Sequence, residues 1–400
     1  MIKNLKELSS TSLRKKALQI VDYGLESINT EKVIRDNIKL KNNTLSIKNK
    51  KINLKKFKRI FVIGFGKASS LMGKEVERVL GSKIDRGIII STKMVKLKRI
   101  RVVKGSHPMP AARNVNAAKK IVGLISGLEK DDLVLCLVSG GGSALFCYPN
   151  IPFKQYMKII KKAFLSGKDI KEFNKLRKKY SYVKDGKLAR LTKAKIVSLI
   201  FSDVVGDDLS TIASGPTVGK GLKNVTNILL LNNMVALEAM KRKARLMGLK
   251  PVVFTNKLKG EARIVGKRLV KSVKNKKGKN IVLLFAGETT VTVKGKGRGG
   301  RNQELCLGAI EAVSKVKDIV LISVGSDGMD GTSNAAGAVV DNDSFERAKR
   351  LGLNYKKYLK DNASHFFFKK INGLVFTGLT GSNVADVGVV LSNKRITFYR

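Results

Sequence analysis

Short apolar runs recur along the chain and are separated by stretches with helical periodicity. The runs are rich in Ile, Val and Leu, a composition typical of strands buried on both faces of a sheet. Before the first run, the pattern predicts a helix from about Ser12 to Ile38 and then a polar stretch, rich in Lys and Asn, up to Lys58. Repeated strand–helix units predict a parallel sheet covered on both faces, with ligands at the carboxyl ends of its strands. Seven strands are expected, at 59–63, 87–90, 133–138, 196–201, 252–255, 281–285 and 319–324.

Length and composition place the chain among globular proteins. With 400 residues it exceeds the usual size of one domain, so two domains are expected. No apolar run approaches the roughly 18 residues that span a bilayer, and the first residues lack the apolar core of a signal peptide. We therefore expect a cytoplasmic protein. The three cysteines, Cys136, Cys147 and Cys306, lack metal-ligand spacing and are expected to be reduced and buried.

The charge of the chain is extreme, because 80 basic and 30 acidic residues give a formal net charge of +50. Such an excess can mark a nucleic-acid-binding protein. However, the lysines are spread along nearly the whole chain, aromatic residues make up 6% and Trp is absent, so no platform for base stacking is visible. We interpret the excess mainly as a lysine-rich surface and do not expect nucleic acid as a partner. An acidic partner stays open as the alternative.

The stretch from 281 to 304 carries the strongest chemical signal. A predicted buried strand is followed by Glu288 and Thr289, and then by glycines interspersed with four cations, the last of which is Arg301. Glycines let a backbone approach a ligand closely, and the cations bind phosphate or carboxylate oxygens. Arg301 also opens a helical pattern, which places its guanidinium beside the positive end of a helix. The pattern favours an anion site, and a basic, flexible hairpin loop is the alternative.

Another cation follows the first predicted strand, in the turn GFGKAS at 64–69. The turn resembles the start of a dinucleotide-binding fingerprint, but Ser69 stands in place of the third glycine, and Ser91 and Thr92 replace the expected acidic residue. A nicotinamide site is therefore disfavoured. Lys67, at a strand-to-helix turn, suits phosphate oxygens, and an ordinary solvated lysine is the alternative.

A glycine turn, SGGGSA at 139–144, follows the third predicted strand. The backbone N–H groups of such a turn can form an anion nest, with the hydroxyls of Ser139 and Ser143 as extra donors. The turn is not a nucleophile elbow, because Leu145 stands where that motif requires glycine. A tight turn that only packs a helix onto the sheet is the alternative interpretation.

Aspartates follow two further strands. Asp203, Asp207 and Asp208 come after the fourth predicted strand, and Asp327 lies in the segment SVGSDGMD after the last one. Carboxylates at strand ends are candidates for Mg²⁺ ligands or for a general base. Capping of a helix or turn is the alternative for Asp207 and Asp208.

Seven motifs stand in a fixed order from about Phe61 onward: VIGFGKAS, SHPMP, LVSGGGSAL, SDVVGDDLSTIASGPT, AGETTVTVKGKGRGGRNQE, GSDGMDGTSNAAGAVVD and TGLTGSNVADV. In this order they resemble the glycerate 2-kinase family that carries the MOFRL domain. The resemblance implies an α/β protein with a larger Rossmann-like parallel-sheet domain, at about 1–230, and a smaller C-terminal α/β domain containing MOFRL, at 231–400. It also implies transfer of a phosphoryl group from ATP to the 2-hydroxyl of D-glycerate, with Mg²⁺, between the two domains.

The resemblance further suggests Lys67 and Arg301 as the cations of the active site. The sequence does not determine the roles of the aspartates, and our hypothesis gives Asp203 a catalytic role and assigns Asp207 and Asp327 to the metal. The residues expected to bind substrate or nucleotide are Gly64, Gly66, Ser139, Gly140, Gly141, Gly142, Ser143, Glu288, Thr289, Asn302 and Gln303.

Two other classes of protein stay open beside the kinase. One is an oxidoreductase acting on hydroxypyruvate, a name that relatives have sometimes carried, and the incomplete dinucleotide fingerprint argues against it. The other is a nucleic-acid-binding protein, which the charge alone suggests. For the kinase, the expected partners are ATP and D-glycerate, with a homodimer possible and no membrane.

Overall fold

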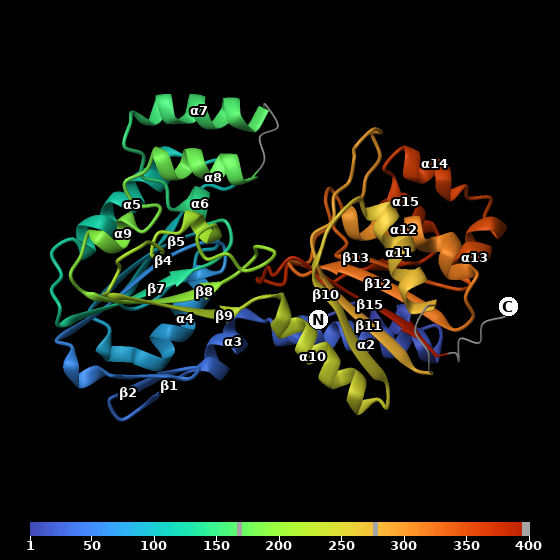
Figure 1. Ribbon diagram of the computed structural model, residues 1–400, viewed down its shortest axis with the longest axis horizontal. Helices are drawn as coiled ribbons and strands as arrows, with labels where there is room; N and C mark the ends of the chain where they lie inside the picture. Colours follow the sequence, from blue (N-terminus) through green and yellow to red (C-terminus); the bar gives the residue numbers. More distant parts are fainter. Residues whose placement is uncertain (166–169, 275–278, 394–400) are drawn as a thin grey trace. The chain divides into compact units, whose positions relative to one another are not determined.

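Figure 1 shows the computed structural model of the chain, which describes residues 1–165, 170–274 and 279–393. The chain divides into two compact units. Unit 1 comprises Met1–Asn29 and Asn233–Arg400, and unit 2 comprises Thr30–Asn232. Each unit combines helices with a six-stranded sheet, so the predicted α/β class is confirmed. The units differ from the predicted ranges 1–230 and 231–400 because residues 1–29 pack with the C-terminal part of the chain.

In unit 2, neighbouring strands of the six-stranded sheet run parallel, as predicted, in the order β6-β5-β4-β7-β8-β9. From β4 the chain adds β5 and β6 on one side and then β7, β8 and β9 on the other, so its progress reverses between β4 and β7. This is the strand order of a Rossmann fold, in which ligands bind at the carboxyl ends of the strands where the order reverses. The strands are β4 (Arg59–Phe65), β5 (Arg86–Ser91), β6 (Ile100–Lys104), β7 (Asp132–Val138), β8 (Lys195–Phe201) and β9 (Val225–Leu231).

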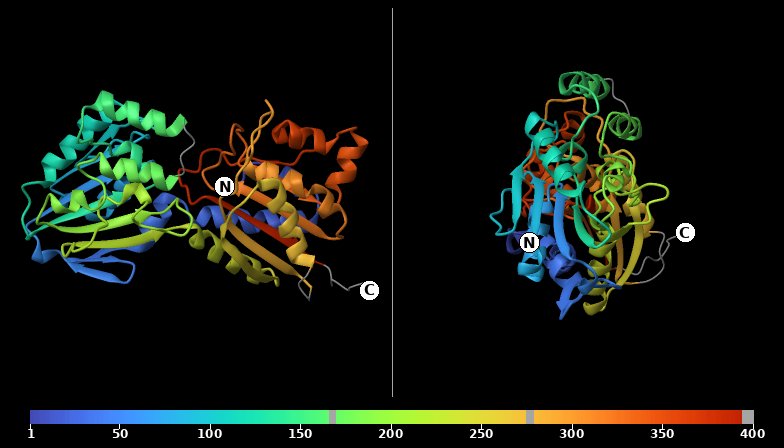
Figure 2. Two further views of the ribbon diagram at one scale, coloured as in Figure 1. Left: turned by 45° about the horizontal axis from the view of Figure 1, so that its top comes forward. Right: turned by 90° about the vertical axis from the view of Figure 1, so that its left-hand side faces the viewer.

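Helices cover both faces of this parallel sheet (Figure 2). On one face lies α4 (Ser69–Leu80), whose Gly73 lets the side chain of Ile89 approach the helix closely. On the other face, α5 (Ala112–Ile125), α6 (Gly142–Leu145) and α9 (Lys187–Arg190) share a hydrophobic core with the strands. Further helical elements of unit 2 are α3 (Thr30–Asn37), α7 (Phe153–Leu165), α8 (Ile170–Lys179), η1 (Leu54–Lys56), η2 (Gly81–Lys83) and η3 (Ile212–Ser214).

The segment before β4 differs from the prediction. The helix expected over 12–38 is two helices, because α2 (Ser12–Ser27) ends before the boundary between the units and α3 begins after it. The polar stretch up to Lys58 contains an antiparallel meander. Its buried Leu45 and Ile47 alternate with polar residues, as strands require, but each strand has only four residues, too short for a clear signal in a stretch rich in Lys and Asn. The meander consists of β1 (Ile38–Lys41), β2 (Thr44–Ile47) and β3 (Lys50–Asn53).

The sheet of unit 1 is mixed, which differs from the parallel sheet that the strand–helix pattern predicted. β10 and β11 are parallel, but β15 enters between β11 and β12 and runs antiparallel to both. β13 and β14 extend the sheet in antiparallel fashion. The physical reason is that the apolar run at 386–392, which the prediction overlooked, returns to the centre of the sheet. The strands are β10 (Lys250–Leu258), β11 (Ile281–Gly287), β12 (Ile319–Gly325), β13 (Gly337–Asp341), β14 (Leu374–Val375) and β15 (Asp386–Ser392).

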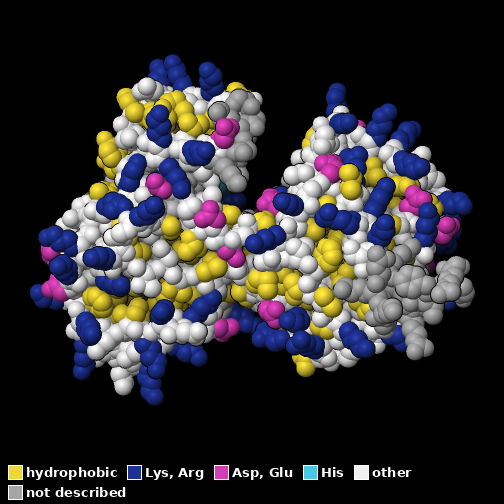
Figure 3. Space-filling model, in the orientation of Figure 1, with side chains coloured by type: hydrophobic (Ala, Val, Ile, Leu, Met, Phe, Trp, Pro, Cys, Tyr) yellow, Lys and Arg dark blue, Asp and Glu magenta, His cyan; other side chains and the backbone are white. Residues whose placement is uncertain are grey.

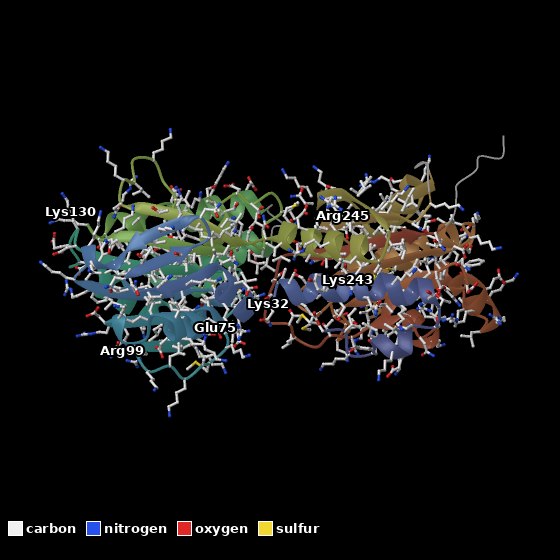
Figure 4. All side chains as sticks on the ribbon, turned by 90° about the horizontal axis from the view of Figure 1, so that it is seen from below. Lys32, Glu75, Arg99, Lys130, Lys243 and Arg245 are labelled. Atoms are coloured by element: carbon white, nitrogen blue, oxygen red, sulfur yellow. The ribbon has the colours of Figure 1, made fainter. Side chains whose placement is uncertain are left out.

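Two helix pairs pack on the sheet of unit 1. α2 contacts β12 and β15, and its neighbour α10 (Asn233–Leu246) contacts β10 and β11. Figure 4 looks onto this pair and labels Lys243 of α10, whose ammonium lies 5.8 Å from the ring centroid of Tyr23 in α2. The second pair, α11 (Ala262–Lys274) and α12 (Arg301–Ser314), shares a hydrophobic core with strands of the sheet. Other helices are α1 (Leu5–Leu8), α13 (Ser344–Arg350), α14 (Tyr355–Lys360) and α15 (Ser364–Lys370).

Surface and composition agree with two further expectations. In Figure 3, Lys and Arg side chains are scattered over the visible face of each unit and do not gather into one stripe. Cys136, Cys147 and Cys306 are buried and form no disulfide, as predicted. No helix among the described residues is long and apolar enough to cross a membrane.

Candidate functional site

Two glycine turns meet at the reversal point of the parallel sheet in unit 2. The turn after β4 lies against the turn after β7 because Gly66, at φ +136°, has no side chain, and a Cβ there would lie 2.1 Å from Ser139 Oγ. The amide of Lys67 donates a hydrogen bond to the carbonyl of Gly140 (2.9 Å), and Ser139 Oγ accepts one from the amide of Ala68 (3.0 Å). The backbone of Lys67 is therefore fixed, while its side chain is exposed.

The turn at 139–143 has the geometry of an anion nest. Gly141 is left-handed, with φ +78°, and α6 begins at the next residue. In the described part of the chain, no atom accepts a hydrogen bond from the backbone N–H of Gly140, Gly141 or Ser143. The aliphatic part of the Lys67 side chain lies against the turn, since a Cβ on Gly141 would lie 3.2 Å from Lys67 Cγ. Three unpaired amides beside an exposed ammonium are the donors that an oxyanion requires.

Asp203 and His107 adjoin the same turn. A Cβ on Gly140 would lie 2.1 Å from Asp203 Oδ2, and one on Gly141 would lie 3.0 Å from His107 Nε2. Burial raises the pKa of Asp203, although its own backbone N–H and the charge of Lys67 oppose the shift. Partial burial lowers the pKa of His107 to about 4, helped by the charges of Lys67 and Arg177, so its imidazole is neutral at pH 7. The structure thus brings together Lys67, Asp203 and the turn, and it adds His107, which our site list lacked.

Arg301 lies in unit 1 at the first position of α12, as predicted, but its guanidinium is already paired. Nε and Nη2 donate to the two carboxylate oxygens of Asp386 (2.6 and 3.1 Å), and Nη1 donates to Glu288 (2.6 Å). Burial opposes the charge of Arg301, but the two carboxylates outweigh this effect and raise the pKa of the guanidinium above its ordinary value. Asp386 opens β15 between Gly287 of β11 and Gly325 of β12. It lies 85 residues from Arg301, so local pattern did not indicate the pair.

The positive end of α12 is occupied by a carboxylate of the chain itself. Asp330 accepts hydrogen bonds from the backbone amides of Asn302 (3.0 Å) and Gln303 (2.8 Å). Burial raises the pKa of Asp330 to about 7, against these hydrogen bonds. The side chain of Asn302 also accepts a hydrogen bond from Ser323 Oγ (2.6 Å), whereas the side-chain amide group of Gln303 is buried and has no partner among the described residues. Asp330 thus caps the start of α12, and the predicted ligand contacts of Asn302 and Gln303 stay predictions.

The remaining aspartates are engaged in turns. Asp207 accepts a hydrogen bond from Asn232 Nδ2 (2.6 Å) in unit 2, and Asp327 accepts one from the amide of Met329 (3.1 Å) in unit 1. Within 1–165, 170–274 and 279–393, no three His, Cys, Asp or Glu side chains are arranged to hold a metal ion. A metal cage built by protein alone therefore does not fit these residues. A Mg²⁺ ion that keeps phosphate and water ligands requires only one or two carboxylates.

Three other predicted residues have simpler surroundings. Gly64 lies inside β4, packed between Ile89 and Leu137, and not in the turn itself. Thr289 is buried directly after β11, and the neighbouring Glu288 is exposed.

An anion nest and a lysine at the reversal point of a Rossmann-like sheet define an α/β enzyme that handles phosphate or carboxylate groups. Residues 16–245 match the family model described as a domain of unknown function, DUF4147, and residues 281–386 match that of the MOFRL family. The chain belongs to the glycerate 2-kinase family that combines these two regions, as its motifs indicated.

Relatives cover nearly the whole chain. The glycerate 2-kinase of Pyrococcus horikoshii is 32% identical, over 96% of this chain and 98% of its own. The D-glycerate 2-kinase of Thermotoga maritima is also 32% identical, over 94% and 97%. The crystal structure of glycerate kinase from T. maritima superimposes with a TM-score of 0.87 at 32% identity, covering 95% of this chain and 99% of that one. A relative from Agrobacterium vitis, 36% identical over 83% of this chain and 99% of its own, is named only provisionally, as a hydroxypyruvate reductase.

Proposed function

We propose that the protein is a glycerate 2-kinase that transfers the γ-phosphoryl group of ATP to the 2-hydroxyl of D-glycerate, giving 2-phosphoglycerate and ADP. The observation that carries the proposal is the exposed Lys67 beside three amides of the turn at 139–143 that have no acceptor among the described residues. Phosphoryl transfer is accelerated mainly by alignment of donor and acceptor and by neutralisation of charge on the phosphoryl oxygens. The turn and the lysine supply both.

Asp203 is the proposed general base. Its carboxylate lies against Gly140 at the nest, and burial raises its pKa, which favours acceptance of a proton. In the proposed step, the 2-hydroxyl oxygen of glycerate forms a bond to the γ-phosphorus as the bond from that phosphorus to the bridging oxygen of ADP breaks. The hydroxyl proton passes to Asp203. Asp207 in unit 2 and Asp327 in unit 1 are proposed as candidate Mg²⁺ ligands, each within its own unit, because each is partly exposed and an ion that keeps phosphate and water ligands needs few carboxylates.

Arg301 is proposed as a second charge clamp. Its Nε and Nη2 are held by the buried Asp386, whereas its Nη1 partner Glu288 is 47% exposed. An anion that reaches Arg301 would therefore displace Glu288 and leave the Asp386 pair intact. The nucleotide-binding roles of Glu288, Thr289, Asn302 and Gln303 are part of this proposal.

The test is an assay of ADP release in the presence of ATP, magnesium chloride and D-glycerate. Turnover that depends on D-glycerate is expected, and 2-phosphoglycerate, not 3-phosphoglycerate, is the expected product. Oxidation of NADH by hydroxypyruvate, followed by absorbance, is the contrasting assay for the reductase. β5 ends at Ser91, without the carboxylate that would hold the ribose of a nicotinamide cofactor, so no oxidation above background is expected. Reductase activity without kinase activity would overturn the proposal.

A further inference from the structure

Lys184 is the most deeply buried of the described lysines of unit 2, with 2% of the residue exposed. Its ammonium donates to two backbone carbonyls, those of Gly142 (3.2 Å) and Ala213 (2.9 Å), and lies 5.5 Å from the ring centroid of Phe146. No carboxylate of the described residues forms an ion pair with it. Because burial of an unpaired charge is costly, a lysine in this place requires a reason beyond packing.

One of the two carbonyls belongs to the anion nest. In a trans peptide group, the C=O of one residue and the N–H of the next point in opposite directions. The carbonyl of Gly142 accepts hydrogen bonds from Lys184 (3.2 Å) and from the amide of Phe146 (2.9 Å), and this orientation of the carbonyl turns the N–H of Ser143 away from the core. That N–H is one of the three nest amides that donate no hydrogen bond to any described residue.

The second carbonyl belongs to a strained turn. Ala213, Ser214 and Gly215 follow one another with φ of +52°, +61° and +63°, a left-handed run that L-residues adopt only when their surroundings enforce it. The backbone next to Lys184 holds this run, because the amide of Asp185 donates to the carbonyl of Ser214 (3.1 Å) and the amide of Gly186 donates to that of Gly215 (2.7 Å).

The strained turn and the nest are in direct contact. A Cβ on Gly142 would lie 2.7 Å from Ala213 Cβ, and the hydroxyls of Ser143 and Ser214 are hydrogen-bonded at 2.9 Å. Lys184 thus bonds to both turns at the place where they meet.

We propose that Lys184 is a positioning residue of the anion site, which fixes the peptide between Gly142 and Ser143 against the strained turn so that the unpaired amides of the nest face one bound anion. The anion is a phosphate or carboxylate group of the substrates, and in this identification the inference rests on the proposed function. Lys184 itself does not touch the ligand.

Lys187 provides a matched control. Its ammonium also donates to two backbone carbonyls at similar distances, those of Lys178 (3.0 Å) and Ser181 (2.9 Å), but neither belongs to the nest or to the strained turn. The variants Lys184→Met and Lys187→Met therefore remove the same number and kind of hydrogen bonds. Only the first should disturb the nest.

The experiment compares these full-length variants with the wild type by steady-state kinetics, by calorimetric titration with Mg-ATP and with inorganic phosphate, and by thermal unfolding. For Lys184→Met we expect at least a tenfold increase in the KM or Kd of the ligand that the nest holds, with a smaller change in kcat. For Lys187→Met we expect a lower Tm with unchanged KM and Kd. A folded Lys184→Met protein with the KM and Kd values of the wild type would overturn the inference.

A second variant keeps the test decisive if Lys184→Met does not fold. Lys184→Gln keeps an uncharged N–H donor group for the carbonyls, so a ligand affinity between those of the wild type and of Lys184→Met is expected. If neither variant folds while Lys187→Met does, Lys184 is a structural residue and the inference fails. A wild type that binds phosphate but does not phosphorylate D-glycerate would defeat the proposed function alone, since the phosphate titrations would still decide the role of Lys184.

Discussion

The anion turn of unit 2 and the arginine site of unit 1 arise from the same sequence signal but differ in the state of their donors. Both place glycines and a cation in the segment that joins a buried strand to the next helix. In unit 2 the side chain of Lys67 is exposed and three amides lack an acceptor among the described residues. In unit 1 the guanidinium of Arg301 is paired with Asp386 and Glu288, and the start of α12 is capped by Asp330. The first site is ready to receive an anion, whereas the second must exchange a carboxylate for it.

This difference explains how each site would contribute to catalysis. Donors that are fixed and unpaired before binding require no reorganisation, so their full interaction with the ligand is available. Arg301 instead loses one ion pair when it gains a ligand, so its net contribution is smaller. Substitutions in unit 2 should therefore cost more activity than conservative substitutions of Arg301.

The largest effect is expected from Lys67→Ala. Removal of the exposed ammonium should lower kcat by roughly 100- to 1000-fold, the usual loss for one preorganised donor, and leave Tm nearly unchanged. Kinetics and circular dichroism measure the two quantities. Lys96→Ala, which removes another exposed lysine of unit 2, is the control and should be silent. Near wild-type turnover in a folded Lys67→Ala protein would remove Lys67 from the site.

A smaller loss is expected from Gly141→Val. The residue is left-handed, and the new Cβ would lie 3.0 Å from His107 and 3.2 Å from Lys67, in the space where the anion is proposed to bind. Ligand affinity should fall roughly 10- to 100-fold, because hydrogen bonds to charged groups each contribute about 1.5–3 kcal/mol. Gly127→Val is the control, since nothing lies within 4 Å of a Cβ there. A variant that melts far below the wild type but binds ligand normally would show that the turn is only structural.

Arg301→Lys should lower kcat/KM by about tenfold, or about 1.4 kcal/mol, at low and at high salt. A lysine keeps the charge but cannot form the two-pronged contact with Asp386 that orients the side chain. Arg298→Lys is the control within the same loop, because Arg298 bonds to Thr332 O and Asn334 Oδ1 in place of carboxylates. Full activity of Arg301→Lys, or equal salt-dependent losses in both variants, would contradict the assignment.

The last prediction concerns the free energy of unfolding and not activity: stability should depend on pH. Burial lowers the pKa of Lys184 from its ordinary 10.5 to about 7, so between these values the folded protein binds fewer protons there than the unfolded chain. The contribution of Lys184 to stability should therefore rise with pH from about 7 to about 10.5 and be constant below that window. Chemical denaturation of the wild type and of Lys184→Met at about pH 6, 7.5 and 9 measures this dependence, because the first pH lies below the window and the other two lie within it. Parallel pH profiles of the two proteins would refute the shift.

What the sequence could predict depended on whether the signal was local. The strand at 281–285 and the helix that begins at Arg301 follow from apolar periodicity, and both are present in the structure. Contacts between residues that are distant in the sequence were not predicted. Asp386 pairs with Arg301 although 85 residues separate them, and Asp330, not Asp327, caps α12. Lys184 has no local marker among the many lysines, because only its burial distinguishes it.

The place of residues 1–29 in unit 1 has a consequence for the order in which the protein can fold as it is synthesised. The apolar face of α2, which includes Leu18, Val21 and Leu25, is buried in unit 1, where α2 packs on α10 and on strands β12 and β15. All these partners are translated after unit 2 is complete. At about 5–20 residues per second, roughly 20 to 70 s separate the synthesis of α2 from that of β15. During this time the complete set of strands on which α2 packs has not yet been synthesised. Nascent unit 2 can therefore fold first, before the two sequence segments of unit 1 assemble.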